Sequence, residues 1–248
     1  MSLDQPLQLP PGEPAAGPWS NQPVQRLVEL VREAAPEVQG RPRIVAVDGR
    51  GGAGKTTLSR QLTAAVPRSA IVHTDDVAWH HSFFDWSELL ATHVLEPLQA
   101  GHGVSYRPPG WIARGRDGSI EVLAGLELVV VEGVGSGRRE LSPLLDAVIW
   151  VQSDHQEAER KGLARDLQEG VNGDAEEAAR FWHEWQTEEL PFLLDQRPWE
   201  RATAIVRGTT AVPHEPGRVV LATPPRPDAT ASPTTSSEQG AAHGTRAR

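Results

Sequence analysis

The sequence predicts an α/β protein whose core is a five-stranded parallel sheet flanked by helices. Short, nearly continuous apolar runs rich in β-branched residues are typical of strands that are covered on both faces. Such runs occupy residues 43–47, 70–73, 127–131, 147–151 and 203–206. Helical patterns separate most of them, and this alternation of strand and helix favours parallel pairing.

The segments between these runs carry the expected helices. Apolar residues at helical spacing predict a helix near 24–31 that packs on the body of the domain. Further helices are predicted at about 55–66 and around 89–98, and long polar helices fill 153–196. Residues 105–122 contain two adjacent prolines and an Asp-Gly pair, which predict a loop and hairpin near the carboxyl edge of the sheet. Ligands of open α/β sheets bind along that edge.

Composition divides the 248 residues into one domain and two tails. Residues 1–22 are crowded with Pro, Gly and Gln, and residues 224–248 contain almost no large apolar side chain. Both stretches are predicted to be disordered because such compositions cannot bury enough apolar surface to offset the entropy of ordering. The folded domain is therefore expected to span 23–223.

Charge and cysteine content exclude several functional classes. The net charge of -9 and the pI of about 5.5 argue against a nucleic-acid footprint, which requires clustered basic residues. No apolar run approaches the roughly 20 residues of a membrane helix, and Met1 starts no charged-then-apolar leader. The absence of cysteine removes disulfides and thiol nucleophiles and suits a reducing compartment. We expect a cytoplasmic protein that binds neither nucleic acid nor membrane.

The strongest motif lies between the first predicted strand and its helix. Residues 49–56 match G-x-x-x-x-G-K-[ST] without a mismatch. Glycines let backbone N–H groups wrap around phosphate oxygens, and the helix adds its positive end. A ligand-free glycine turn would not explain a Lys-Thr pair at the helix start. The predicted nucleotide-binding residues of this loop are Gly49, Arg50, Gly51, Gly52, Ala53, Gly54, Lys55, Thr56 and Thr57.

A magnesium nucleotide needs oxygen ligands beside this loop. The hydroxyl of Thr56 is the expected ligand from the loop, with Lys55 reaching the β- and γ-phosphates. Glu132 ends the apolar run of 127–131 and is expected at the sheet edge facing the phosphates, as a second magnesium anchor. The alternative for Glu132 is an ordinary acid that ends a strand at a turn.

A pair of aspartates distinguishes phosphotransfer from the other uses of such a loop. The strand at 70–73 is followed by Asp75 and Asp76, next to the expected γ-phosphate position. A carboxylate there can accept the proton of an attacking hydroxyl. Either aspartate could instead cap a turn. The sequence lacks the Asn-Lys-x-Asp guanine signature and the Leu-Ser-Gly-Gly transporter signature, which weakens those two alternatives.

Taken in order, "VDGRGGAGKTT", "TDD", "VVVEG", "RKGLARD" and "ATAIVRGT" resemble the uridine kinase family of P-loop nucleoside and nucleoside-monophosphate kinases, over about residues 43–210. The resemblance implies a P-loop NTPase fold with a helical lid at about 153–196, ATP as donor and Mg²⁺. It implies that Asp75 is the general base, with Asp75 and Glu132 near the metal. Val77 stands where the family's Asp-x-Phe pattern has an aromatic residue.

The lid segment contains the expected cationic clamp on the moving phosphoryl group. Arg160, Lys161 and Arg165 recur at helical spacing and can project from one side. Family members carry a similar "RR...RD" there, so the resemblance implies a catalytic role for Arg165 first and for Arg160. The alternative is a solvated face paired with Glu157, Glu159 and Asp166.

Recognition of the acceptor is not carried over from the family, because its pyrimidine-binding pattern is replaced by "PPGWIARGR". Asp85 could alternatively cap a helix through a box with Glu88. By the resemblance, the segment around Arg207 and Gly208 lies beside adenine, whereas the aromatic residues of 181–199 are assigned to core or lid packing. The acceptor candidates, all in loops expected near the reactive edge, are Asp76, His80, His81, Asp85, Tyr106, Arg107, Trp111 and Arg114.

The sequence therefore predicts an ATP-dependent kinase of uridine kinase-like type that phosphorylates a hydroxyl of a small molecule, such as a nucleoside. Two alternatives stay open: the acceptor is a non-nucleoside alcohol, or the protein is a regulatory P-loop ATPase that turns ATP over slowly. The sequence leaves the oligomeric state undetermined.

Overall fold

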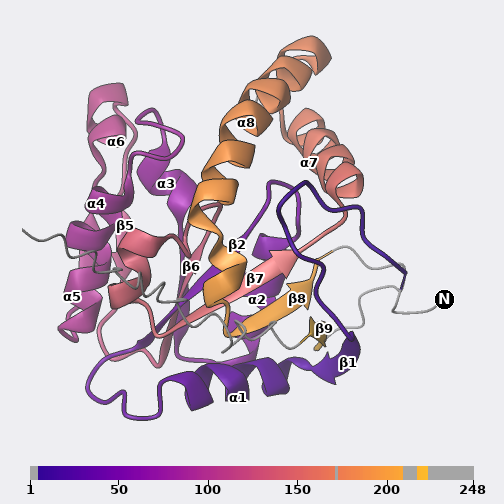
Figure 1. Ribbon diagram of the computed structural model, residues 1–248. Coiled ribbons are helices and arrows are strands. Elements are labelled where there is room, and N and C mark those ends of the chain that lie inside the picture. The colour runs from indigo at the N-terminus through magenta and orange to yellow at the C-terminus, as the bar shows by residue number, and fades with distance from the viewer. Residues whose placement is uncertain (1–4, 171–172, 209–216, 223–248) are drawn as a thin grey trace, which may run out of the picture.

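The computed structural model describes residues 5–170, 173–208 and 217–222, and these form a seven-stranded sheet with helices on both faces (Figure 1). The strand order is β1-β9-β8-β7-β2-β6-β3. The five strands from β8 to β3 are parallel, while β9 and β1 extend the sheet antiparallel beyond β8. The strands are β1 Ser20–Pro23, β2 Arg43–Gly49, β3 Ser69–His73, β6 Leu128–Glu132, β7 Ala147–Gln152, β8 Ala204–Arg207 and β9 Arg218–Ala222.

The five predicted strands are the five parallel ones, so the α/β fold class is confirmed. In the register, Val47 of the central strand lies between Glu132 of β6 and Ile149 of β7. The ends of these strands therefore come together at one edge of the sheet. Strand β1 was not predicted, because the polar run Ser20–Pro23 has no strand periodicity and pairs only with β9. The apolar run 219–222 of β9 was a strand signal that the sequence analysis missed.

The helices alternate with the strands as the sequence predicted. The predicted helix around 89–98 is one continuous stretch with a π-helical turn, η1, in its middle. The predicted hairpin pairs β4 with β5, with a short helix between them. These elements are α1 Val24–Ala34, α2 Lys55–Ala65, α3 Thr74–Ala78, α4 Ser87–Leu90, η1 Ala91–Leu95, α5 Glu96–Gln99, β4 Val104–Tyr106, α6 Pro109–Arg114, β5 Ile120–Val122, η2 Arg139–Leu144, α7 His155–Glu169, α8 Ala175–Gln196 and η3 Pro198–Arg201.

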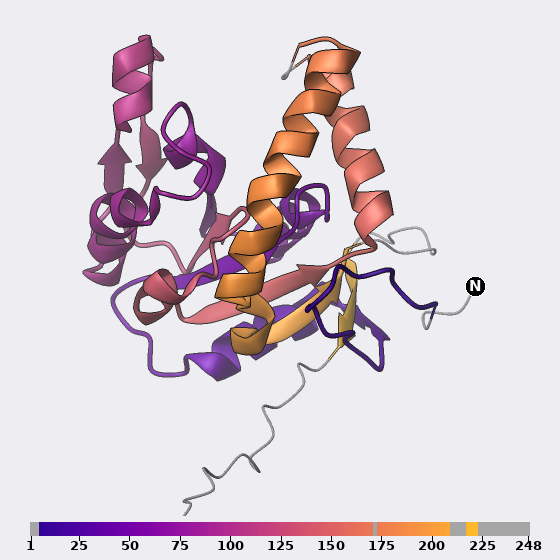
Figure 2. The ribbon, with the colours of Figure 1, turned by 45° about the horizontal axis from the view of Figure 1, so that its top comes forward.

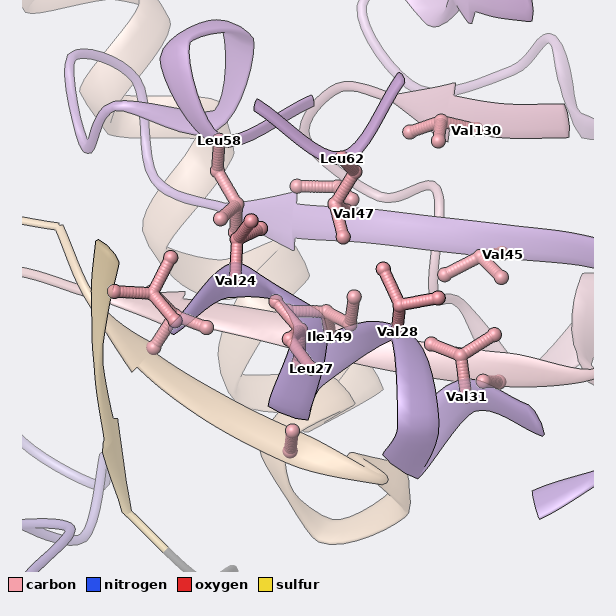
Figure 3. Close-up of a cluster of buried hydrophobic side chains, with 14 of the residues drawn as sticks. Val24, Leu27, Val28, Val31, Val45, Val47, Leu58, Leu62, Val130 and Ile149 are labelled. Carbon is pink, nitrogen blue, oxygen red and sulfur yellow. The ribbon is translucent and has the colours of Figure 1, made fainter. Parts of the chain in front are cut away.

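Two layers of apolar side chains hold the helices to the sheet. On one face, Leu27 and Val31 of α1 and Leu62 of α2 pack on Val45 and Ile149 (Figure 3). On the other face, one cluster joins α4, η1, α5 and the hairpin to β6, and another joins the carboxyl-terminal half of α8 to β7 and β8. Burial of each such side chain contributes about 1.5–3 kcal/mol, so the carboxyl ends of the strands sit on a rigid base.

Helices α7 and α8 form an antiparallel pair that projects from the carboxyl edge of the sheet, opposite the arm made by the hairpin and α6 (Figures 1 and 2). The pair packs closely because α7 has a glycine at the contact. A Cβ on Gly162 would lie 2.1 Å from the Trp182 ring. The buried Asp166 accepts a hydrogen bond from Nε1 of Trp182 at 2.8 Å. No helix among the described residues is long and apolar enough to span a membrane.

The amino-terminal segment differs from the expectation of a disordered tail at 1–22. Residues 5–19 run across the ends of β7 and β8, and β1 then pairs with β9. Gln152 of β7 fastens this segment by accepting from the Ala16 N–H and donating to the Pro14 carbonyl, at 2.9 Å each. Tertiary contacts thus order a stretch whose composition alone disfavours order. The tail predicted at 224–248 lies outside the described residues.

Candidate active site at the carboxyl edge of the sheet

The predicted phosphate loop joins the end of β2 to the start of α2, which is the context that its motif requires. Gly52 and Gly54 have φ values of 73° and 100°, which favour glycine. A Cβ on Gly52 would lie 1.9 Å from the Ala158 carbonyl oxygen of α7, so the loop and the lid helix touch backbone to backbone. Nζ of Lys55 donates to the Arg50 carbonyl at 2.8 Å, which holds the ammonium group across the loop.

Thr56 and Glu132, the predicted metal ligands from two elements, are in contact. The Thr56 hydroxyl donates to Oε2 of Glu132 at 3.2 Å, and Nδ1 of His73 lies 2.6 Å from the same oxygen. Burial acts to raise the pKa of Glu132, but His73, Lys55 and Thr56 together hold that pKa below its ordinary value. The hydrogen bond to Glu132 raises the pKa of His73 despite opposing burial. His73 was missed by the sequence analysis, although it is the last residue of its strand.

Asp75 lies in the first turn of α3, beside this pair. Desolvation by the surrounding protein raises its pKa, and repulsion from Glu132 adds to the effect, whereas Lys55, His73 and Arg165 oppose it. The carboxylate accepts no hydrogen bond from a described residue, and the residue is exposed. Asp75 is thus an exposed residue whose carboxylate is unpaired among the described residues and is influenced by charges from the phosphate loop, β3, β6 and α7.

Asp76 has a different environment from Asp75. Its carboxylate forms an ion pair with Arg116 at 2.8 Å, and its carbonyl accepts from Nε1 of Trp111 at 2.8 Å. The Arg116 guanidinium in turn stacks 3.6 Å above the Trp111 ring and 5.2 Å from the Trp79 ring. Asp76 therefore anchors the hairpin arm to α3, whereas Asp75 is unpaired among the described residues.

Two of the three predicted lid cations form ion pairs within α7. Arg165 contacts the Asp166 carboxylate at 2.8 Å, and Lys161 contacts Glu157 at 2.8 Å. The Arg165 side chain is nevertheless 54% exposed, and its charge acts on Asp75 across the space between α7 and α3. Arg160 is exposed on the same helix. The sequence left open whether these cations pair within the helix or act on the reaction site. The structure shows ion pairs within α7 and also an effect of the Arg165 charge on Asp75.

The remaining acceptor candidates are dispersed over the hairpin arm and the segment before α4. Tyr106 stacks on His93 at 4.4 Å, with its hydroxyl buried and unpaired among the described residues, and burial raises its pKa. Arg107 donates to the Arg116 carbonyl at 2.7 Å, and His80 packs edge-on against Trp79. The capping box considered for Asp85 is absent, since Trp86 is the N-cap and no side chain caps α4. The exposed candidates are His80, His81, Asp85, Arg107 and Arg114.

A buried aspartate that the sequence analysis passed over fastens the phosphate loop to the loop after β6. The Asp48 carboxylate accepts N–H bonds from Gly49, Gly135 and Gly137 at 2.7–2.9 Å. Burial raises the pKa of Asp48 to about 6, although these three bonds and Lys55 oppose the shift. Its position directly after the apolar run 43–47 was a sequence signal for such contacts, because a charge at the end of a buried strand needs polar partners.

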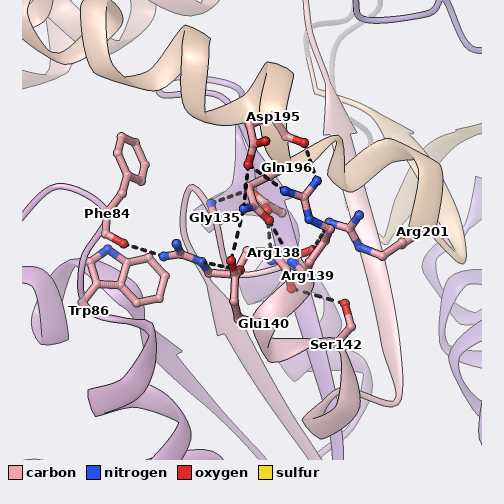
Figure 4. Close-up of polar contacts among 12 residues, drawn as sticks. Phe84, Trp86, Gly135, Arg138, Arg139, Glu140, Ser142, Asp195, Gln196 and Arg201 are labelled. Atoms are coloured by element: carbon pink, nitrogen blue, oxygen red, sulfur yellow. Dashed lines mark hydrogen bonds and ion pairs between the residues drawn. The ribbon is translucent and has the colours of Figure 1, made fainter.

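The loop after β6 also contacts the segment before α4 and the end of α8 (Figure 4). Nη1 of Arg138 donates to the Phe84 carbonyl at 2.5 Å, and its guanidinium lies over the rings of Trp86 and Phe192. The Arg139 N–H donates to Oε1 of Gln196 at the end of α8. One loop therefore joins the phosphate loop, the segment before α4 and the base of the lid.

Glu189 of α8, another residue that was not predicted, holds the outer part of the phosphate loop. Its Oε1 accepts the Gly51 N–H at 2.7 Å and the Trp185 Nε1–H at 3.1 Å. Its Oε2 lies 3.9 Å from Nη1 of Arg50. Glutamate at position 189 carries no sequence signal for this contact, because the partners are about 138 residues apart along the chain.

Arg207 and Gly208, the predicted adenine-side residues, lie beside the phosphate loop. A Cβ on Gly208 would lie 1.9 Å from the Ala53 carbonyl oxygen, so the two backbones are in contact. The buried Arg207 side chain donates to the Gln5 carbonyl at 2.8 Å and lies over Trp19. The side chain is thus covered by the amino-terminal segment.

The loop between β2 and α2, the strand order and the projecting helix pair define a P-loop NTPase fold. Comparison with solved structures agrees. A protein provisionally described as a fructose transport system kinase from Silicibacter sp. TM1040 is 22% identical, with a TM-score of 0.50 over 64% of this chain and 88% of that one. The resemblance found in the sequence is thereby confirmed at the level of the fold.

Two other solved structures are more distant. A protein provisionally described as a uridine kinase from Bacillus stearothermophilus is 19% identical over 73% of this chain and 98% of its own, with a TM-score of 0.40. The D-glycerate 3-kinase of Cryptococcus neoformans is 14% identical over 67% and 87%, with a TM-score of 0.45. No family model matches the sequence, and no curated protein matches it.

Proposed function

We propose that the protein is an ATP-dependent kinase that transfers the γ-phosphoryl group to a hydroxyl of a small molecule, with nucleosides such as uridine as the first acceptors to test. The observation that carries this proposal is the environment of Asp75. Its carboxylate is unpaired among the described residues, and the charges of Lys55, Glu132 and the lid cation Arg165 all act on it. A hydrolase or switch needs no such carboxylate at this position.

In the proposed reaction, backbone N–H groups of the phosphate loop and Nζ of Lys55 bind the β- and γ-phosphates. The oxygen of the acceptor hydroxyl bonds to the γ-phosphorus while Asp75 takes the hydroxyl proton. The bond between the γ-phosphorus and the bridging oxygen of the β-phosphate breaks, and ADP is released. Arg165 balances negative charge on the transferred group, with Arg160 on the same helix as a second cation. Packing of α7 on Gly52 excludes water from the loop, which favours transfer over hydrolysis.

Magnesium fits the residues at the loop. Thr56 and Glu132 provide two oxygen donors that already touch, and Mg²⁺ in such sites is held by one or two protein oxygens together with phosphates and water. When bound with ATP, the ion supplies charge neutralisation between the β- and γ-phosphates. The negative charge of Glu132 acts to raise the pKa of Asp75, and we propose Asp75 as a further acidic group beside the metal.

Acceptor specificity is proposed to reside in the arm formed by α3, the hairpin and α6. Asp76, Arg116 and Trp111 hold one another in place there, and Tyr106 and Arg107 belong to the same arm.

The decisive experiment measures ADP formation with Mg-ATP and a panel of nucleosides, sugars and other alcohols, with mass detection of phosphorylated products. A nucleoside that raises ADP formation and gains one phosphate supports the proposal. Phosphorylation of a different alcohol would support the kinase proposal and would show that the acceptor is not a nucleoside. If no acceptor raises ADP formation above the water background, the protein is a slow ATPase of regulatory type and the kinase proposal fails.

A further inference from the structure

His73 is the last residue of β3 and lies beside Glu132, the last residue of β6. The register of the parallel sheet pairs these two residues directly, so their side chains leave the sheet on the same face. Residues 70–72 and 129–131, which precede them, are apolar, so the two polar side chains meet where the strands end. The reaction proposed above gives His73 no role, although this residue contacts a predicted metal ligand.

One oxygen of the Glu132 carboxylate makes both of its hydrogen bonds to described residues. Nδ1 of His73 lies 2.6 Å from Oε2, and the Thr56 hydroxyl lies 3.2 Å from the same atom. The Thr56 distance is longer than the usual O–H···O range of roughly 2.5–3.0 Å. Lys55 acts on Glu132 through its charge, and its Nζ donates to the Arg50 carbonyl instead. His73 is therefore the stronger restraint on the orientation of this carboxylate.

The second oxygen of Glu132 is left free by this arrangement. A metal-binding carboxylate is ionised and only accepts hydrogen bonds, so Nδ1 of His73 carries the proton of their contact. Oε1 accepts no hydrogen bond from a described residue, and it is not among the fully buried unpaired atoms of the described chain, so it stays accessible. Magnesium prefers oxygen ligands. The contact with His73 thus engages one oxygen and leaves the other for the metal or for a water bound to it.

We propose that His73 is a positioning residue of the metal site: its Nδ1–H holds Glu132 by Oε2 and so keeps Oε1 available to magnesium. This inference rests on the proposed function, which requires a magnesium nucleotide. His73 does not bind the metal itself, because Glu132 engages Nδ1 and magnesium favours oxygen over nitrogen. Loss of a group that hydrogen-bonds to a metal ligand typically costs about 10–100-fold in metal affinity.

The test measures binding of Mn²⁺, a paramagnetic substitute for magnesium, to the full chain with a non-hydrolysable ATP analogue, by electron paramagnetic resonance. Asparagine and leucine have nearly the same shape, but only asparagine has an N–H donor at the position of Nδ1. His73→Leu should weaken Mn²⁺ affinity about tenfold to 100-fold, whereas His73→Asn should stay within about threefold of the wild type. Equal weakening in both variants, or none in His73→Leu, overturns the proposal.

A merely structural role for His73 would change other properties as well. Binding of the ATP analogue without metal should be the same in the wild type and in both variants, because the phosphate loop does not depend on this contact. His102→Ala, a change of an exposed histidine before β4, is the control and should bind Mn²⁺ normally. A loss of metal-free nucleotide binding as large as the loss of Mn²⁺ affinity overturns the positioning role.

Circular dichroism checks that each variant is folded. His73→Ala, which also lacks a donor, takes the place of His73→Leu if the leucine variant is unfolded. The measurement uses no acceptor, so it separates this inference from the kinase proposal. If Mn²⁺ affinity depends on His73 but no alcohol is phosphorylated, the kinase proposal alone fails. If an alcohol is phosphorylated and Mn²⁺ affinity does not depend on His73, this inference alone fails. Absence of Mn²⁺–nucleotide binding by the wild type overturns both.

Discussion

Glu13 forms a buried ion pair with Arg50, which joins the amino-terminal segment to the phosphate loop across 37 positions of the chain. Glu13 also accepts hydrogen bonds from Nε1 of Trp150 at 2.8 Å and Nε2 of Gln152 at 3.1 Å. A segment that precedes the first parallel strand thus fixes both the loop and the end of β7.

Replacing Glu13 with Gln should destabilise the protein by about 3 kcal/mol, because a buried guanidinium loses its nearest countercharge. Chemical unfolding at neutral pH measures the change in the free energy of unfolding. Glu37→Gln, an exposed glutamate-to-glutamine change, is the control and should stay within about 0.5 kcal/mol. Equal stability of the two variants would show that the amino-terminal segment does not hold the loop.

Asp75→Asn should reduce phosphotransfer by about 100-fold or more while ATP affinity is largely kept, because the amide cannot accept the hydroxyl proton. Asp76→Asn should act differently: with the Arg116 ion pair lost, acceptor KM should rise more than kcat falls. Steady-state kinetics and nucleotide binding of both variants measure this contrast. Normal turnover in Asp75→Asn would remove Asp75 from the role of base.

The raised pKa of Asp75 gives kcat/KM a defined dependence on pH. A general base works only when deprotonated, so activity should fall as the pH falls through a value above the ordinary aspartate range of about 4. The Arg165→Met variant loses a cation that lowers this pKa, and its acid limb should move to still higher pH. An acid limb at the same pH in both enzymes would show that the charge of Arg165 does not lower the pKa of Asp75.

Asp48 should make stability depend on pH in the opposite sense to a salt-bridged aspartate. Its folded pKa of about 6 lies above its unfolded value of about 3.9, so the folded state binds the proton more tightly. The Asp48 contribution to stability therefore rises as pH falls from about 6 to about 4, by up to about 3 kcal/mol. Unfolding of the wild type and of Asp48→Asn across this range isolates the effect as the difference between the two curves. Parallel curves would refute it.

Gly162→Ala should separate α7 from α8, because the new methyl group would meet the Trp182 ring. Overpacking of this kind costs about 1–3 kcal/mol. Since Arg165 stands one turn further along α7, we expect kcat to fall more than ATP affinity. Ala164→Ser, an exposed change on the same helix, serves as control. If kcat is unchanged in Gly162→Ala, close packing of the helix pair is not needed for transfer.

The parallel strands, the phosphate loop and the order of the helices could all be predicted from local sequence patterns. These features follow from local periodicity and from one motif whose spacing has a direct physical meaning. An example is the apolar run 43–47, which predicts a strand and is followed by the phosphate-loop residues Gly49 and Lys55. The aspartate pair was also visible, since it directly follows a strand.

The different environments of these residues could be seen only in the folded protein. Asp76 is paired with Arg116, 40 positions away, and Asp75 is not paired among the described residues. The contacts of Glu13 and Glu189 with the phosphate loop, and of His73 with Glu132, join parts of the chain that share no local pattern. Periodicity reports which face of an element is buried, whereas a polar contact between distant segments depends on where the whole fold brings them, and no local stretch encodes that.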